Sequence, residues 1–142
     1  MLVRCLYASR AASPIDAKTL DAILEKSRSN NKPQGITGLL CIAGDVFIQV
    51  IEGGRDPVCE LLKSIFSDSR HHDVRILTYE EIAERRFEDW AMGQVNMNKI
   101  NPSILLKYSE KAEINPFFCS GETTMAMLSE LLATGAIVNR RN

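Results

Sequence analysis

The sequence predicts one α+β domain, because short β-rich runs alternate with amphipathic helical patterns in the order β-α-β-β-α-β-β, and two more helical patterns follow. Two apolar runs at 35–43 and 45–52 meet at Ala43-Gly44-Asp45, which is typical of a tight hairpin. A β-α-β-β-α-β order is that of the ferredoxin-like architecture, here with one extra strand. We expect two helices on one face of a βαββαββ sheet and a C-terminal helical pair on the other face.

The first strand is expected at 2–8 and the first helix directly after it. Ser13 has the character of an N-cap, Pro14 suits the first helical position, and Asp16 places an acid in the first turn. The helical pattern ends in the polar stretch 29–33, where Pro33 prevents simple continuation. Asn31 is therefore expected just past the end of this helix.

The remaining elements are predicted from the same start and stop signals. In chain order they are a helix from Asp56-Pro57, a strand at 73–80, a charged turn at 81–89, a strand at 90–97, a helix from Asn101-Pro102, and a helix from Ser120 that stops at Gly135.

Composition excludes several classes of function. The 142 residues carry a net charge of −1, and no basic run exceeds Arg85-Arg86 and Arg140-Arg141, so neither a nucleic-acid nor a membrane footprint is expected. No apolar stretch reaches about 18 residues, and we expect a soluble cytoplasmic protein. Four cysteines without a C-x-x-C spacing are predicted to be reduced, mostly buried side chains: Cys5, Cys41, Cys59 and Cys119.

Strand alternation brings unusual polar residues together. Tyr7 shares a face with Val3 and Cys5, and Gln49 shares one with Phe47 and Ile51. If the first and third strands are adjacent, the phenol and the amide are neighbours. A buried glutamine without partners costs about 1–3 kcal/mol, so Gln49 needs hydrogen-bonding groups around it.

A second amide, Asn31, would suit the same site. Two amides and a phenol match the edge of a planar heterocycle with alternating donors and acceptors. By the same alternation, Trp90 and Met92 are expected to share a face of the last strand.

Each residue also has an ordinary structural explanation. Tyr7, Trp90 and Met92 are typical core side chains, Asn31 suits a helix C-terminus, and Gln49 suits an exposed strand position. Two adjacent histidines, His71-His72, lack a third metal ligand, so no metal site is expected. Spacing and composition therefore indicate a pocket without identifying its ligand.

Taken in order, the segments resemble the BLUF family of flavin-binding blue-light sensors over residues 1–97. The matching segments are Leu6-Tyr7-Ala8-Ser9, Asn31, Gly35-Ile36-Thr37-Gly38-Leu39-Leu40, Phe47-Ile48-Gln49-Val50-Ile51-Glu52-Gly53 and Trp90-Ala91-Met92-Gly93. Residues 98–142 resemble the short helical extension of BLUF proteins that have no separate output domain.

The resemblance implies a non-covalent flavin, FAD with FMN or riboflavin as alternatives, held between the first two helices. Tyr7 matches the redox-active tyrosine, Gln49 the switching glutamine and Asn31 the asparagine at the ring edge, while Trp90 and Met92 match the pair on the last strand. Further positions match the pocket walls, the ribityl chain or the phosphates: Ile23, Leu24, Asn30, Lys32, Leu40, Phe47, Ile65, Asp68, Arg70 and His71. Four of these, Lys32, Asp68, Arg70 and His71, are equally typical of solvated helix ends.

The implied function is a reversible photocycle without enzymatic turnover. The excited flavin would take an electron from Tyr7, and the proton would follow through Gln49. Rotation and tautomer exchange of the Gln49 amide both stay open. Trp90 and Met92 would pass the change to helices at 102–110 and 121–134, and from there to a downstream protein or a second copy, which would form a homodimer through the sheet or the C-terminal helices. The alternatives are a light-independent ferredoxin-like ligand-binding or hydrolase domain and an interaction module, although no nucleophile with a base is visible.

Overall fold

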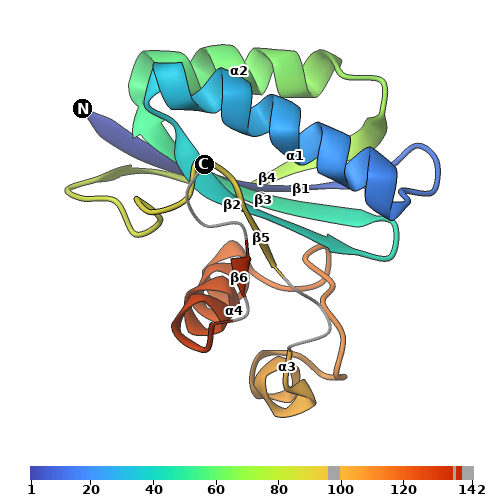
Figure 1. Cartoon of the computed structure of the whole chain (residues 1–142). Helices are drawn as coiled ribbons and strands as arrows, with labels where there is room; N and C mark the ends of the chain where they lie inside the picture. The colour runs from blue at the N-terminus through green and yellow to red at the C-terminus, as the bar shows by residue number, and fades with distance from the viewer. Residues whose placement is uncertain (96–99, 136, 139–142) are drawn as a thin grey trace.

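The computed structural model describes residues 1–95, 100–135 and 137–138, and these form an α+β fold (Figure 1). The described strands form one sheet in the order β4-β1-β3-β2-β5-β6. They are β1 (Leu2–Ala11), β2 (Thr37–Ala43), β3 (Val46–Gly54), β4 (His71–Ile82), β5 (Gly93–Val95) and β6 (Ile137–Val138). The helices are α1 (Ala17–Asn31), the short 3-10 helix η1 (Lys32–Gln34), α2 (Arg55–Ser67), α3 (Pro102–Tyr108) and α4 (Gly121–Ala133).

The antiparallel order β4-β1-β3-β2 is that of the predicted ferredoxin-like sheet, which the structure confirms. β5 then adds in parallel to β2. Helices α1 and α2 cover one face, and α3 and α4 lie on the other (Figure 1). The central strands are buried on both sides for this reason, and every residue of β3 from Val46 to Gly53 is buried.

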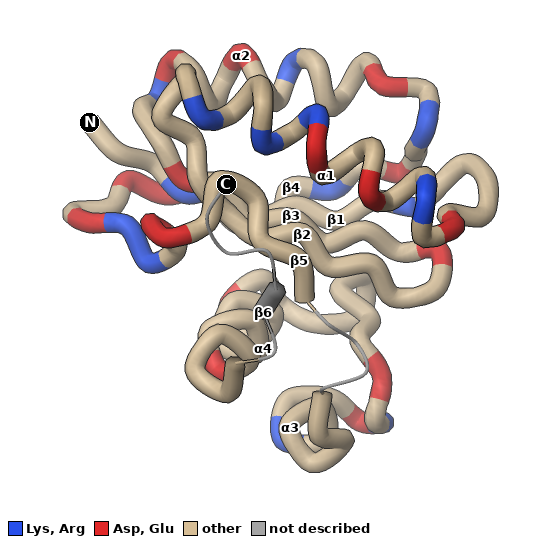
Figure 2. The backbone as a smooth tube through the Cα atoms, in the orientation of Figure 1, with Lys and Arg blue, Asp and Glu red and all other residues tan. Residues whose placement is uncertain are grey.

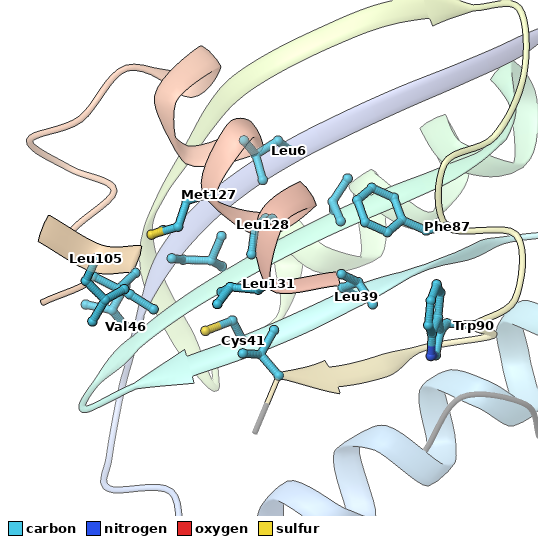
Figure 3. Close-up of a cluster of buried hydrophobic side chains, with 14 residues drawn as sticks. Leu6, Leu39, Cys41, Val46, Phe87, Trp90, Leu105, Met127, Leu128 and Leu131 are labelled. Atoms are coloured by element: carbon cyan, nitrogen blue, oxygen red, sulfur yellow. The ribbon is translucent and has the colours of Figure 1, made fainter. Parts of the chain in front are cut away.

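Two clusters of buried side chains fill the two faces. The cluster under α1 and α2 includes Cys5, Leu24, Phe47 and Val58. The cluster toward α3 and α4, drawn in Figure 3, contains the following buried residues: Leu6, Leu39, Cys41, Val46, Ile48, Val50, Phe87, Trp90, Val95, Leu105, Ile114, Met127, Leu128 and Leu131. The C-terminal helices are thus part of the core and not an appended tail.

The two helices in the N-terminal half of the chain, α1 and α2, begin at residues other than those predicted. α1 is capped by Asp16, whose side chain accepts a hydrogen bond from the backbone N–H of Thr19. Ser13 and Pro14 stay outside the helix because β1 continues to Ala11, so Ser13 as N-cap was wrong. α1 also includes Asn31 as its last residue. α2 likewise starts earlier than Asp56-Pro57, with Gly54 as its N-cap.

In the C-terminal half of the chain, the ends of the helices were predicted more accurately than the strands. Asn101 and Ser120 cap α3 and α4 through their side chains, as expected, and α4 ends before Gly135, whose φ is 78°. The strand predicted over 90–97 is reduced to Gly93–Val95, and residues 96 and 97 lie outside the described part of the chain. The short strand β6 was not predicted.

The four cysteines are thiols that form no disulfide with one another, and their burial is mixed. Cys5 and Cys41 are buried, and desolvation raises the pKa of each thiol to about 12. Cys59 is exposed and Cys119 partly buried, so the expectation of small buried hydrophobes applies to two of the four.

The charged residues are distributed without segregation. Lys or Arg and Asp or Glu are interspersed along α1 and α2 (Figure 2). None of the helices in the described residues has the length and apolar character needed to cross a bilayer.

Substitution of Gly38 tests how closely β2 and β3 pack in the sheet. A Cβ at this position would overlap the backbone carbonyl of Val50 on the neighbouring strand β3. We expect Gly38→Ala to lower the free energy of unfolding by about 3 kcal/mol or more, since backbone atoms cannot relax as a flexible side chain can. Urea unfolding measures this. Gly54→Ala is the control, because its Cβ would meet only Pro57 at an ordinary 3.4 Å; equal losses in both variants would contradict the prediction.

Candidate functional site

Tyr7 and Gln49 are the centre of the site. They are register partners on β1 and β3, both side chains are buried, and the Tyr7 hydroxyl donates a hydrogen bond to Gln49 Oε1. The prediction that the phenol of Tyr7 and the amide of Gln49 are neighbours is therefore confirmed. Burial raises the pKa of the Tyr7 phenol, with smaller contributions from the nearby Cys5 and Asp68, so the phenol stays protonated and able to donate.

The other end of the Gln49 amide faces Met92. Gln49 Nε2 lies 3.3 Å from Met92 Sδ, a weak acceptor. With Oε1 accepting from Tyr7, the amide retains one N–H and one lone pair for a further partner. This is the arrangement expected of a residue that also binds a ligand.

A cleft opens above this pair, between α1 and α2. One cavity of about 100 Å³ is lined by Tyr7, Ile23, Ser27, Leu40, Phe47, Gln49, Ile65, Asp68, Arg70 and His71. A second cavity of about 290 Å³ is lined by Ile23, Lys26, Ser27, Asn30, Asn31, Leu61, Ser64, Ile65, Asp68 and Arg70. Because five lining residues are common to both, the two cavities form one cleft, near the lower end of the range for small-molecule sites, about 300–1,000 Å³.

The structure brings most of the predicted site residues to this cleft. Of the residues predicted to bind the cofactor, two lie elsewhere. Leu24 is fully buried in the core on the same face, and Lys32 lines a separate groove with Gly35, Thr37 and Arg85.

The sequence prediction missed four lining residues: Lys26, Ser27, Leu61 and Ser64. Helical spacing could have found them. Lys26 and Ser27 follow Ile23 by three and four positions on α1, and Leu61 and Ser64 stand at the same spacing before Ile65 and Asp68. Two facing helical stripes therefore line the cleft.

Trp90 and Met92 lie on opposite faces of the sheet, and the prediction that they share one was wrong. Met92 is fully buried in the cluster under α1 and α2, whereas Trp90 belongs to the cluster toward α4, where Figure 3 shows it near Phe87 and Leu39. The reason is that residues 90–92 precede β5 and do not follow the alternation of a strand. Met92 is the member of the pair that faces the site.

Helix α1 holds the backbone beside Met92. Arg28 Nε donates to the Met92 carbonyl at 3.0 Å, and Asn31 Nδ2 lies 3.5 Å from the Ala91 carbonyl. Asn31 is buried, so its amide is fixed at the helix end that borders the cleft. Arg28 had no predicted role.

His71 is engaged at both ring nitrogens. Nε2 lies 2.6 Å from the Ile65 carbonyl, and Nδ1 lies 2.7 Å from the hydroxyl of buried Ser9. Because a carbonyl only accepts, Nε2 carries the proton and, in the neutral ring, Nδ1 accepts from Ser9. The ring meets those of Tyr7 and Phe47 edge-on. Among the described residues, no group of three or more His, Cys, Asp and Glu side chains could hold a metal.

An ion pair closes the polar end of the cleft. Arg70 Nη2 lies 2.6 Å from Asp68 Oδ2, and hydrogen bonding by Arg70 holds the pKa of Asp68 at about 2, below its ordinary value of 3.8. A lowered folded-state pKa stabilises the fold above about pH 4, and that contribution is lost as the pH falls toward 2.

We therefore expect Asp68→Asn to destabilise the protein at pH 7 by at most about 1 kcal/mol, because Arg70 is largely exposed. The difference from the unchanged protein should shrink between pH 5 and pH 2. Unfolding curves at several pH values measure this, and a difference that grew toward low pH would contradict it.

Comparison with known proteins agrees with this geometry. The family model described as sensors of blue-light using FAD (BLUF) matches residues 2–93. The photoactivated adenylate cyclase subunit beta of Euglena gracilis is 33% identical over 92 residues, which are 64% of this chain and 11% of that protein. The blue light- and temperature-regulated antirepressor BluF of Escherichia coli K12 is 26% identical over 87 residues, 61% of this chain and 22% of that protein.

Solved structures cover more of the chain. The photo-activated state of BlsA is 31% identical with a TM-score of 0.80, over 93% of this chain and 95% of that one. The dark-state structure of the BLUF protein BlrB is 31% identical with a TM-score of 0.75, over 94% of this chain and 96% of that one.

A ferredoxin-like sheet with a buried Tyr–Gln pair beneath an interhelical cleft defines a ligand-binding domain. This chain belongs to the BLUF family, the sensors of blue-light using FAD. The sequence expectation of a blue-light sensor with FAD is thereby confirmed, and the light-independent alternative is not favoured. The chain spans only about a tenth of the cyclase subunit, at 11% of its length.

The residues of the cleft fit a flavin. Apolar side chains from α1, α2 and the strands line the cleft and offer apolar walls for a ring system: Ile23, Ile65, Leu40 and Phe47. Gln49 supplies a free donor and acceptor at the floor, and the asparagines and Arg70 supply polar groups in the larger of the two cavities.

Proposed function

We propose that light is converted to a structural change by the Tyr7–Gln49 pair, with FAD bound in the cleft between α1 and α2. The observation that carries the proposal is the buried hydrogen bond from the Tyr7 hydroxyl to Gln49 Oε1 at the cleft floor. When bound, the flavin supplies blue-light absorption and an excited state that accepts an electron. Within the proposal, Asn31, Arg70 and His71 contact the ligand.

The buried pair suits reversible proton-coupled electron transfer. Tyr7 can release an electron only if its proton has an acceptor, and Gln49 Oε1 is in place. When the electron and the proton return to Tyr7, the Gln49 amide is left rotated or as its tautomer, and its hydrogen bonds to Tyr7 and Met92 are exchanged for others. Nothing is consumed, so the cycle can repeat.

The output is proposed to be a protein partner or a second copy of this chain. The names of two relatives support regulation of another activity, since one is a photoactivated cyclase subunit and another an antirepressor. Residues 1–97 would be the sensor and 98–142 an extension that packs on it. In support, buried residues of α4, such as Met127, Leu128 and Leu131, belong to the core of the sheet.

The test is absorption spectroscopy on the purified chain, loaded separately with FAD, FMN and riboflavin. We expect a yellow protein whose flavin absorption shifts reversibly to the red in blue light and recovers in the dark. A protein that takes up no flavin would refute the proposal. Flavin uptake without a reversible shift would instead favour a light-independent ligand-binding domain.

A further inference from the structure

Glu52 is a buried carboxylate outside the cleft. It lies on β3, three residues after Gln49, and its side chain is fully buried. Its oxygens accept hydrogen bonds from Arg4 Nε at 2.8 Å, from the Arg86 backbone N–H at 3.0 Å and from the Phe87 backbone N–H at 2.7 Å. Burial of a charge is costly unless it is paired, and here both oxygens have partners.

Two of those partners belong to the segment that leads to Met92. Phe87 is fully buried, and Arg85 adds a hydrogen bond from its side chain to the Glu52 carbonyl at 3.3 Å. This segment, between β4 and β5, therefore meets β3 at two places: Glu52 holds the backbone at 86–87, and Gln49 meets Met92 five residues later. Only the second contact involves the amide that changes in the proposed photocycle.

We propose that Glu52 is a positioning residue for the light switch: it anchors the start of the 86–92 segment to β3, so that a change at Gln49 moves Met92 relative to a fixed point. This inference rests on the proposed function, because the movement has meaning only if Gln49 switches. Without the anchor, a change at Gln49 would be absorbed by displacement of the whole segment. With it, only the short stretch 88–92 adjusts.

The chemistry of the site requires a carboxylate. All three groups directed at the Glu52 side chain are donors, and the site thus needs an acceptor-only group. A glutamine of the same size would turn an NH₂ toward at least one donor. Arg4 also pairs with Glu80 on β4 at 2.9 Å, so its charge keeps one partner in such a variant.

The experiment uses the full chain with flavin bound. In Glu52→Gln we expect flavin binding and the red shift to be retained, because Tyr7 and Gln49 are untouched. Dark recovery should accelerate about tenfold, since a loosened segment presents a lower barrier to return. Glu52→Asp, which keeps an acceptor-only group, should recover at a rate between those of Glu52→Gln and the unchanged protein.

Glu80→Gln is the matched control, because it removes the other carboxylate of Arg4 and leaves the backbone contacts of Glu52 in place. It should recover at the unchanged rate. Recovery of Glu52→Gln within twofold of the unchanged protein, or equal acceleration in Glu80→Gln, would overturn the inference. Absence of any red shift in the unchanged protein would instead refute the proposed function.

Hydrogen exchange on the unchanged protein gives a second test. It needs no variant, so it can be carried out even if Glu52→Gln does not fold. The backbone amides of Arg86 and Phe87 should be protected equally in the dark and in the light, while those of residues 90–92 change. Changes at Arg86 and Phe87 as large as those at 90–92 would overturn the inference.

Discussion

Replacing Tyr7 with phenylalanine is expected to abolish the reversible red shift in blue light, while flavin binding stays within about threefold of that of the unchanged protein. The substitution removes the hydroxyl that donates to Gln49 Oε1, which in the proposed mechanism also supplies the electron and the proton. The ring remains, so the buried wall of the cleft keeps its shape. Leaving the buried Gln49 Oε1 without this donor costs about 1–3 kcal/mol, which the fold can tolerate.

Absorption spectra before and after illumination measure this, with flavin content determined on the same samples. Tyr79→Phe is the matched control, because Tyr79 is exposed on β4 and its hydroxyl contacts Cys59, at 4.0 Å, and the side chain of Arg55 instead of the switching glutamine. This control should switch normally. A persistent red shift in Tyr7→Phe would remove Tyr7 from the proposed mechanism.

Strand alternation predicted the centre of the site because β1 and β3 are regular over their whole length. The register that pairs Tyr7 with Gln49 also pairs Arg4 with Glu52, three residues along each strand. Opposite charges facing each other inside two apolar strands therefore indicate the Arg4–Glu52 pair from the sequence. The backbone partners of Glu52, at 86 and 87, come from a loop whose path no periodicity specifies.

The same alternation gave a wrong prediction for Trp90 and Met92, because these residues precede β5 and are not part of a strand. The backbone there is held by contacts from other elements: the Gly38 N–H donates to the Trp90 carbonyl at 2.8 Å, and Arg28 donates to the Met92 carbonyl. Such contacts depend on tertiary packing. The start of α1 was missed for a related reason, since β1 continues beyond the predicted end and moves the cap from Ser13 to Asp16.

The opposite placement of Trp90 and Met92 makes the output testable. Met92 contacts Gln49 on one face of the sheet, and Trp90, two residues away, packs in the cluster that includes Leu128 and Leu131 of α4. A displacement of the backbone at 90–92 would thus reach the far face through Trp90. We expect Met92→Ala to keep the red shift but to reduce light-induced changes in the hydrogen exchange of α4 at least fivefold.

Met127→Ala is the matched control for this substitution. Met127 is a buried methionine of α4 itself, and it lies on the face of the sheet opposite the cleft that Gln49 lines. Both changes should cost about 2–5 kcal/mol of stability, so loss of core packing alone affects them alike. Only Met92→Ala should separate the red shift from the response of α4. If α4 responds to light as strongly in Met92→Ala as in Met127→Ala, the signal crosses the sheet by another route.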